Sequence, residues 1–138
     1  MTANNEIVPT ESEEQKMVFE WAELSAGRYP ELALLFHIPN GSYKSIAMAE
    51  KFKKEGLKSG VPDICLPVPH GEFHALFIEM KRTKGGKISE NQKWWIDNLR
   101  QYGNRVEVCY GCEEAVAVLE DYLNLGQRNL PNVFNAKF

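Results

Sequence analysis

The 138-residue chain is predicted to fold as one α/β domain, a mixed β-sheet flanked by helices in the order α-β-α-β-β-α-β-α. Three observations support this prediction. Capped amphipathic segments alternate with short apolar segments of strand length. The chain has the length of a single domain, typically about 100–150 residues. It also has no internal repeat and no linker that would divide it.

Helix starts are indicated by two capping-box patterns. Thr10 is followed three residues later by Glu13, and Ser89 is followed at the same spacing by Gln92. Glycines after the apolar positions indicate where helices end. The predicted helices run from the Thr10 cap to Gly27, from Ser42 to Glu55, from Ser89 to Tyr102 and from Glu113 to Leu123.

Four apolar segments have strand length. The first, Leu32–Ile38, ends at the turn-forming sequence Pro39-Asn40-Gly41. The second, Gly60–Pro69, is rich in proline, which predicts a strand that is short or lies near a sheet edge. The other two are His74–Lys81 and Arg105–Tyr110.

Composition excludes several classes of protein. Hydrophobic residues at 43% and charged residues at 25% are typical of a globular domain. No apolar run approaches the ~20 residues of a membrane span, and Met1–Thr10 lacks the features of a signal peptide. Cys109 and Cys112 form a lone C-x-x-C spacing without a second pair. We therefore expect reduced thiols, including Cys65, and an intracellular, cytoplasmic protein.

The charge is unevenly distributed. The net charge is −3, yet the segment Lys44–Lys93 contains ten basic and six acidic residues. A protein that binds polyanions needs positive potential only where the phosphates lie. Solvated helix faces and a solvated loop would give the same pattern, so charge alone does not decide between these interpretations.

Two carboxylates and a lysine are predicted to meet at the end of two strands. Side chains alternate along a strand, so Glu79 and Lys81 point the same way and Met80 points opposite. Gly71 lies eight residues from both Asp63 and Glu79. A hairpin through Gly71 would therefore bring the three polar side chains together.

This group of side chains suits metal-assisted phosphodiester chemistry. Mg²⁺ is bound by one or two carboxylates plus substrate phosphates, and Asp63, Glu79 and the Met80 carbonyl offer oxygens. The ion would polarise a phosphoryl oxygen and acidify water, while Lys81 would orient the water and stabilise developing charge. The alternative is a surface ion pair between Glu79 and Lys81, with Asp63 as a turn cap.

The pattern Pro62-Asp63 followed by Glu79-x-Lys81 resembles the motif of the PD-(D/E)xK nuclease superfamily. More narrowly, the chain resembles the stand-alone phage and bacterial members of the VRR-NUC (virus-type replication-repair nuclease) family over residues 11–124. The motifs are Glu11-x-x-Glu14-Gln15, Ile38-Pro39-Asn40-Gly41, Gly60-Val61-Pro62-Asp63, Phe77-Ile78-Glu79-Met80-Lys81 and Ser89-Glu90-Asn91-Gln92.

The resemblance implies a restriction-endonuclease-like fold and a homodimer that hydrolyses phosphodiester bonds of DNA with Mg²⁺, for which Mn²⁺ substitutes. It implies branched substrates such as junctions or flaps, and a role in DNA repair. Residues 1–10 are expected to form a flexible N-terminus, and residues 125–138 a mobile tail or a dimer arm.

Site roles also follow from the resemblance. Asp63 and Glu79 would be metal ligands and Lys81 the catalytic lysine. Gln92 matches the family's trailing glutamine and would support the site. Glu11 and Glu14 are alternative candidates for a further ligand from the first helix, with Glu11 slightly preferred for its spacing from Gln15.

Several further residues are candidates for DNA contacts. Basic side chains on a mobile loop can follow a phosphate backbone without reading bases, and Lys51 and Lys54 could join such a track. His37 is interpreted as a core histidine, and Trp94 and Trp95 cannot both be buried on one helix face. The DNA-binding candidates are Asn40, Lys44, Lys58, Arg82, Lys84 and Lys87.

Three functions are compatible with these patterns. The preferred one is a metal-dependent, structure-selective endonuclease. A non-catalytic DNA-binding or assembly module would have no reason to keep Asp63, Glu79 and Lys81 together. A redox protein using Cys109 and Cys112 lacks the usual strand–C-x-x-C–helix position with a small core partner, although Cys112 lies near a predicted helix start.

Overall fold

The computed structural model describes residues 7–40 and 43–126. Within this part of the chain, four strands form one mixed sheet in the order β1-β2-β3-β4. The β1–β2 and β2–β3 pairs are antiparallel, whereas β3 and β4 are parallel. The predicted α/β class and order of elements are confirmed. The strands are β1 (Phe36–His37), β2 (Ile64–Leu66), β3 (Leu76–Lys81) and β4 (Arg105–Tyr110).

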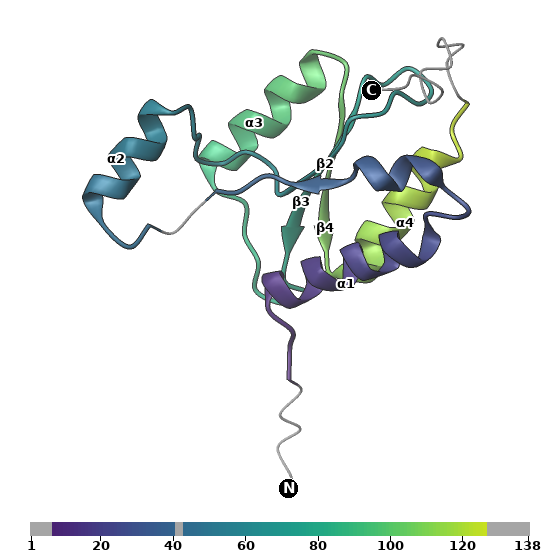
Figure 1. The fold of residues 1–138 in the computed structure, drawn as a ribbon, viewed down its shortest axis with the longest axis horizontal. Helices are drawn as coiled ribbons and strands as arrows, with labels where there is room; N and C mark the ends of the chain where they lie inside the picture. Colours follow the sequence, from purple (N-terminus) through teal and green to yellow (C-terminus); the bar gives the residue numbers. More distant parts are fainter. Residues whose placement is uncertain (1–6, 41–42, 127–138) are drawn as a thin grey trace, which may run out of the picture.

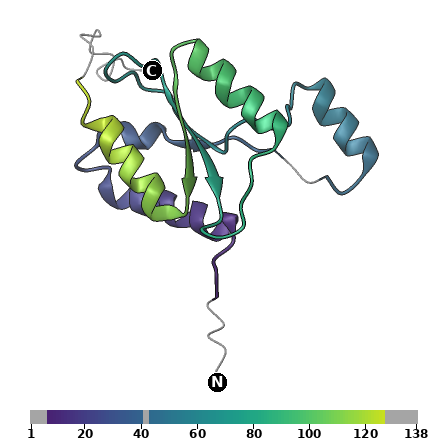
Figure 2. The same cartoon turned by 180° about the vertical axis from the view of Figure 1, so that it is seen from behind.

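Helices cover both faces of the sheet (Figures 1 and 2). Two of them, α1 (Glu11–Ser25) and α4 (Cys112–Leu123), pack together on one face, and α3 (Glu90–Gln101) packs on the other. The core forms on the α1–α4 face, where alternate β3 residues Ile78 and Met80 are buried against both helices. Alternation along β3 therefore directs Glu79 and Lys81 towards α3.

The remaining helix, α2 (Ile46–Lys54), projects from the body, as Figure 1 shows. It packs against no other helix or strand in the described residues, and none of its residues is buried. The structure begins this helix at Ile46 with Ser45 as its cap, later than the predicted Ser42.

Both capping-box patterns mark helix starts, and the reciprocal pair of hydrogen bonds is described at Ser89. Ser89 accepts a hydrogen bond from the backbone of Gln92, whose side chain in turn accepts one from the backbone of Ser89. At the first helix, the Thr10 side chain accepts the Glu13 N–H. Both predicted helix starts are therefore confirmed.

The prediction of a strand over Leu32–Ile38 is wrong for its first half. The structure has a 3₁₀ helix, η1 (Pro30–Leu34), followed by the two-residue β1. Leu32 and Leu35 are buried whereas Leu34 is 47% exposed, so the apolar pattern has a period of three rather than two. Proline at the first position fixes the φ angle that begins this helix.

The proline-rich segment Gly60–Pro69 contains only the three-residue β2, as its prolines predicted. It does not lie at an edge, because it pairs with β1 and β3. Among the described helices, none is both long and apolar enough to cross a membrane. The predictions for residues 1–6 and for the tail beyond residue 126 lie outside the described residues.

Candidate active site

Antiparallel pairing brings Asp63 next to Glu79. Ile64 pairs with Ile78, so continuing the register by one residue places Asp63 opposite Glu79. Asp63 Oδ2 accepts the Met80 N–H at 2.7 Å, which fixes the carboxyl group against β3. The Asp63 carbonyl accepts the N–H of Ile38 from the β1 side, also at 2.7 Å. The predicted hairpin geometry is confirmed.

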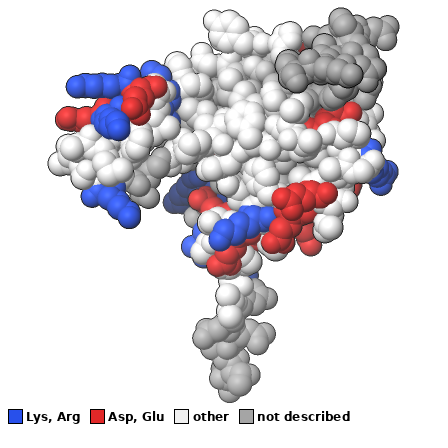
Figure 3. Space-filling view, viewed as in Figure 1, with Lys and Arg blue, Asp and Glu red and all other residues white. Residues whose placement is uncertain are grey.

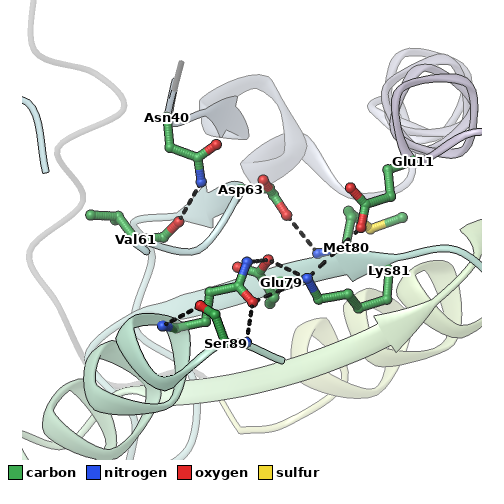
Figure 4. A network of polar contacts seen from close by, with 9 residues as sticks. Glu11, Asn40, Val61, Asp63, Glu79, Met80, Lys81 and Ser89 are labelled. Carbon is green, nitrogen blue, oxygen red and sulfur yellow. Dashed lines mark hydrogen bonds and ion pairs between the residues drawn. The ribbon is translucent and has the colours of Figure 1, made fainter. Parts of the chain in front are cut away.

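Glu79 and Lys81 lie side by side and buried at the end of β3. Glu79 is 2% exposed and Lys81 6%. Lys81 Nζ lies 3.6 Å from Glu79 Oε1 and 3.8 Å from Glu11 Oε1 (Figure 4). The surface ion pair considered above as the alternative is therefore wrong, because both partners are shielded from water.

Gln92 connects Glu79 to Lys81. Its Nε2 donates to Glu79 Oε1 at 2.8 Å, and its Oε1 accepts from Lys81 Nζ at 3.1 Å. The capping box at Ser89 fixes the Gln92 side chain, since the same Oε1 also accepts the Ser89 N–H at 2.9 Å. The start of α3 thus holds the charged groups of β3 in place.

The two carboxyl groups lack sufficient neutralising partners. Burial and the neighbouring Asp63 carboxylate raise the pKa of Glu79 to about 8, against the opposing effect of Lys81. Burial, followed by the charge of Glu11, also raises the pKa of Asp63, although the Met80 hydrogen bond opposes this. Glu79 Oε2 is buried and has no hydrogen-bond partner among the described residues. Such a pair needs a proton or a cation.

The donor set fits a hard cation that keeps several waters. In the described residues, no three His, Cys, Asp or Glu side chains form a group that would hold a metal ion by themselves. A Mg²⁺ site does not require such a group, because one or two carboxylates with substrate phosphates suffice. Asp63 and the orphaned Glu79 oxygen provide the two carboxylates.

The two candidate glutamates of the first helix lie in different environments. Glu11 is half-exposed, and its charge acts on Asp63 and Lys81. Glu14 is 5% exposed, and its Oε2 accepts the Cys112 N–H at 2.6 Å at the start of α4. The sequence offered no signal for this contact, because Glu14 and Cys112 are far apart along the chain.

The predicted DNA-binding residues fall into two groups. Asn40 donates to the Val61 carbonyl at 3.2 Å and lines a pocket together with Lys58. The other four are exposed on loops: one precedes α2, and three lie between β3 and α3. They are Lys44, Arg82, Lys84 and Lys87.

The prediction that His37 lies in the core is wrong. His37 is exposed, and its Nδ1 donates to the Asp63 carbonyl at 2.7 Å. It therefore helps to position Asp63, a role that only the pairing of β1 with β2 makes possible.

The structure also shows the burial and contacts of the two tryptophans and of Cys109. Trp94 is 59% exposed, whereas Trp95 is half-buried and its Nε1 donates to the Ser59 carbonyl, so the two tryptophans differ in burial as predicted. Cys109 is buried, and burial raises its pKa to about 12. A thiol of that kind is a poor nucleophile, which argues against redox catalysis.

The fold and the site define a class of protein. A mixed sheet flanked by helices, with two carboxyl groups and a lysine at the ends of paired strands, is the arrangement of a restriction-endonuclease-like protein. The family model of the VRR-NUC domain matches residues 4–113, and the chain belongs to that family. Membership implies a nuclease-type function in DNA processing.

A solved structure supports this assignment. The chain is similar to a "VRR_NUC domain protein", with a TM-score of 0.75 and 29% sequence identity. The match covers 86% of this chain and 92% of that one. No curated protein matches the chain.

Proposed function

We propose that the protein is a divalent-metal-dependent DNA endonuclease that hydrolyses phosphodiester bonds, with selectivity for branched DNA. The main observation is the neighbouring carboxyl groups of Asp63, which is partly buried, and Glu79, which is buried. One Glu79 oxygen lacks a hydrogen-bond partner in the described residues, and the Lys81 amine lies 3.6 Å from the other. A site that keeps such carboxylates together, with the pKa of each raised, is typical of catalysis. The same feature disfavours a non-catalytic binding module.

Asp63 and Glu79, together with the Met80 carbonyl, would hold Mg²⁺ or Mn²⁺. When bound, the ion supplies Lewis-acid polarisation of the scissile phosphate. Glu11, half-exposed and directed at Lys81, is the better candidate for a further contact, because Glu14 is engaged at Cys112.

Lys81 contributes a positively charged side chain to the site. Its amine would orient the attacking water and stabilise the negative charge that develops on the phosphate oxygens. Gln92 would act as a positioning residue, because it binds Glu79 with its amide nitrogen and Lys81 with its amide oxygen.

DNA would reach the site along basic residues around it. Lys58 and Asn40 would contact the strand from the α2 side, and Lys44 would extend this track. Arg82, Lys84 and Lys87 lie on the loop directly after Lys81, where they could contact phosphates flanking the cleaved bond.

A cleavage panel tests the proposal. Linear, flap, splayed and four-way DNA are incubated with the protein in Mg²⁺, in Mn²⁺ and in EDTA. We expect branched DNA to be cut in either ion and to remain intact in EDTA.

The Lys81→Ala variant sharpens this test. It should lose cleavage by at least about 100-fold while it still folds and still binds DNA. Lys93→Ala, an exposed lysine on α3, is the matched control and should cut normally. Cleavage at the wild-type rate by Lys81→Ala would overturn the mechanism, and DNA binding without cleavage under every condition would favour the non-catalytic module.

We also propose that the protein is a homodimer, by analogy with the stand-alone members that its motifs resemble. Sedimentation equilibrium should give about twice the chain mass of 15.8 kDa. A species at the chain mass across the micromolar range would contradict this.

A further inference from the structure

A pocket of about 470 Å³ adjoins the candidate active site. Gln92 belongs to both, since it lines the pocket and donates to Glu79 at 2.8 Å. The pocket therefore begins one side chain away from the carboxyl groups of Glu79 and Asp63. Its other polar lining residues come from α2, from the loops on either side of it and from the N-cap of α3: Asn40, Tyr43, Lys53, Lys58, Ser59 and Ser89.

The lining of this pocket combines positive charge with an aromatic ring. Lys53 and Lys58 contribute two cations, and none of the described lining residues is acidic. Tyr43 is stacked on Phe52 of α2, with ring centroids 5.6 Å apart and planes inclined by 30°. The stacking partner holds the Tyr43 ring at the pocket while its other face is free of stacking partners in the described residues.

The outer wall of the pocket is α2, which packs against no other helix or strand in this part of the chain. Figure 3 shows blue lysine side chains on this projecting helix, with red acidic side chains between them. Lys51 and Lys54 carry further positive charge on the last turn, outside the pocket lining. A projecting helix with several lysines, which forms a pocket together with the rest of the domain, suits a polyanionic ligand.

We propose that this pocket binds one unpaired nucleotide of the DNA strand, with its base stacked on Tyr43 and its phosphates against Lys53 and Lys58. This inference rests on the proposed function and specifies the part of the substrate that selects for branched DNA. A volume of about 470 Å³ lies within the range of roughly 300–1,000 Å³ for small-molecule sites. A base inside an intact duplex cannot reach such a pocket, whereas a base at a fork, flap or junction can.

Equilibrium binding in EDTA tests the proposal without cleavage. The probes are a blunt duplex and the same duplex with a three-nucleotide single-stranded extension that contains 2-aminopurine. Stacking on an aromatic ring contributes about 1–3 kcal/mol per base, which corresponds to roughly 5- to 150-fold in affinity. We therefore expect the wild-type protein to bind the extended duplex at least about five times more tightly and to quench the 2-aminopurine fluorescence.

Substitutions at Tyr43 separate stacking from charge. Tyr43→Ala should remove most of the preference for the extended duplex and most of the quenching, with little effect on blunt duplex. Tyr43→Phe keeps the ring and should retain both. The unfolding temperature of each variant shows whether the fold is kept.

Two double variants on and near α2 provide a matched comparison of charge. Lys53→Ala/Lys58→Ala removes the two lysines that line the pocket, and Lys51→Ala/Lys54→Ala removes two that do not. Both should weaken binding to the two duplexes, but only the first should also lower the affinity ratio. Equal reduction of the ratio by both would show a general charge effect and would overturn the pocket.

The outcomes for the pocket and for the endonuclease can be told apart. Equal affinity of the wild-type protein for both duplexes would contradict nucleotide binding in the pocket, even if the protein cleaves branched DNA. An unchanged ratio of the two affinities in Tyr43→Ala would contradict it as well. An affinity ratio that depends on Tyr43, without cleavage under any ionic condition, would contradict the proposed endonuclease activity and support nucleotide binding in the pocket.

Discussion

At the scale of single residues, Glu79 links the stability of the protein to pH. Its pKa is raised to about 8 by burial and by Asp63, from an ordinary value of 4.5. The folded metal-free protein therefore binds more protons than the unfolded chain between these values. The protonated Glu79 therefore contributes to the stability of the folded protein. This contribution is fully present below pH 4.5 and is lost as the pH rises through about 8.

The first prediction concerns Glu79→Gln in EDTA. The variant cannot ionise at this position, and its new amide can donate towards Asp63. We expect its unfolding temperature at pH 9 to exceed that of the wild type by on the order of 5 °C, with a smaller difference at pH 5. Thermal unfolding followed by circular dichroism measures this.

Glu50→Gln, at an exposed position on α2, is the control and should follow the wild-type pH profile. A wild-type unfolding temperature that rises between pH 5 and pH 9 relative to Glu79→Gln would show that the carboxyl pair is not strained.

A second prediction concerns Gln92. Gln92→Ala removes the contacts to Glu79 and Lys81, so those groups lose their orientation. Residues that orient active groups in this way typically contribute about 10- to 100-fold in activity. We expect the rate constant for single-turnover cleavage to fall by that factor.

Ser89→Ala provides the matched control for Gln92. It removes the oxygen that accepts the Gln92 N–H but leaves the Gln92 side chain intact. Both variants should lose about 1 kcal/mol of stability through the cap. Only Gln92→Ala should lose most of the activity, and equal losses in both would reduce the role of Gln92 to helix capping.

At the scale of elements, Glu14 joins α1 to α4. Gly111, the N-cap of α4, has no side chain, and the Glu14 carboxylate accepts the Cys112 N–H in its place. Gly111 also has φ of +93°, and a Cβ there would lie 2.7 Å from Thr83. No other residue type fits this N-cap without strain, so the cap must come from another element.

The third prediction separates the two glutamates of α1. Glu14→Ala should lower the free energy of unfolding by about 1–3 kcal/mol, because it removes the acceptor of the partly buried Cys112 N–H. Glu11→Ala should change it by less than about 0.5 kcal/mol but should lower cleavage activity. Urea unfolding and the cleavage assay together measure the difference.

Glu14→Gln keeps an acceptor oxygen and should recover most of the lost stability. A large loss of stability in Glu11→Ala, with none in Glu14→Ala, would contradict this division of roles.

Elements were predictable where a local signal exists. The Ser89 capping box and the proline-limited β2 follow from nearby residues. The 3₁₀ helix η1 was not predicted, because the apolar residues of Leu32–Ile38 are compatible with a strand as well as with a 3₁₀ helix. Its period of three becomes visible only when Leu34 is seen to face solvent.

At the scale of the whole molecule, the uneven charge predicts the salt dependence of DNA binding. The loop between β3 and α3 carries Arg82, Lys84 and Lys87 next to the site. If all three contact phosphates, replacing them with Gln should reduce the slope of log affinity against log salt concentration by about 2–3. Fluorescence anisotropy over a salt series measures this slope.

Lys16→Gln on α1 is the control for this prediction. Lys16 is exposed and lines, with Glu20 and Glu23, a separate surface pocket that shares no residue with the candidate active site. It should leave the slope unchanged, and an equal change per charge in both variants would mean that binding follows net charge rather than the position of the loop.

The sequence by itself determined the order of the helices and strands and the identity of the Asp63, Glu79 and Lys81 group. These features depend on periods, caps and spacings of a few residues, which act locally. Only the tertiary structure decided that Glu14 caps α4 while Glu11 faces Lys81, that His37 supports Asp63, and that α2 encloses a basic pocket. Each of these contacts joins segments distant along the chain, and their positions depend on how the sheet and helices pack.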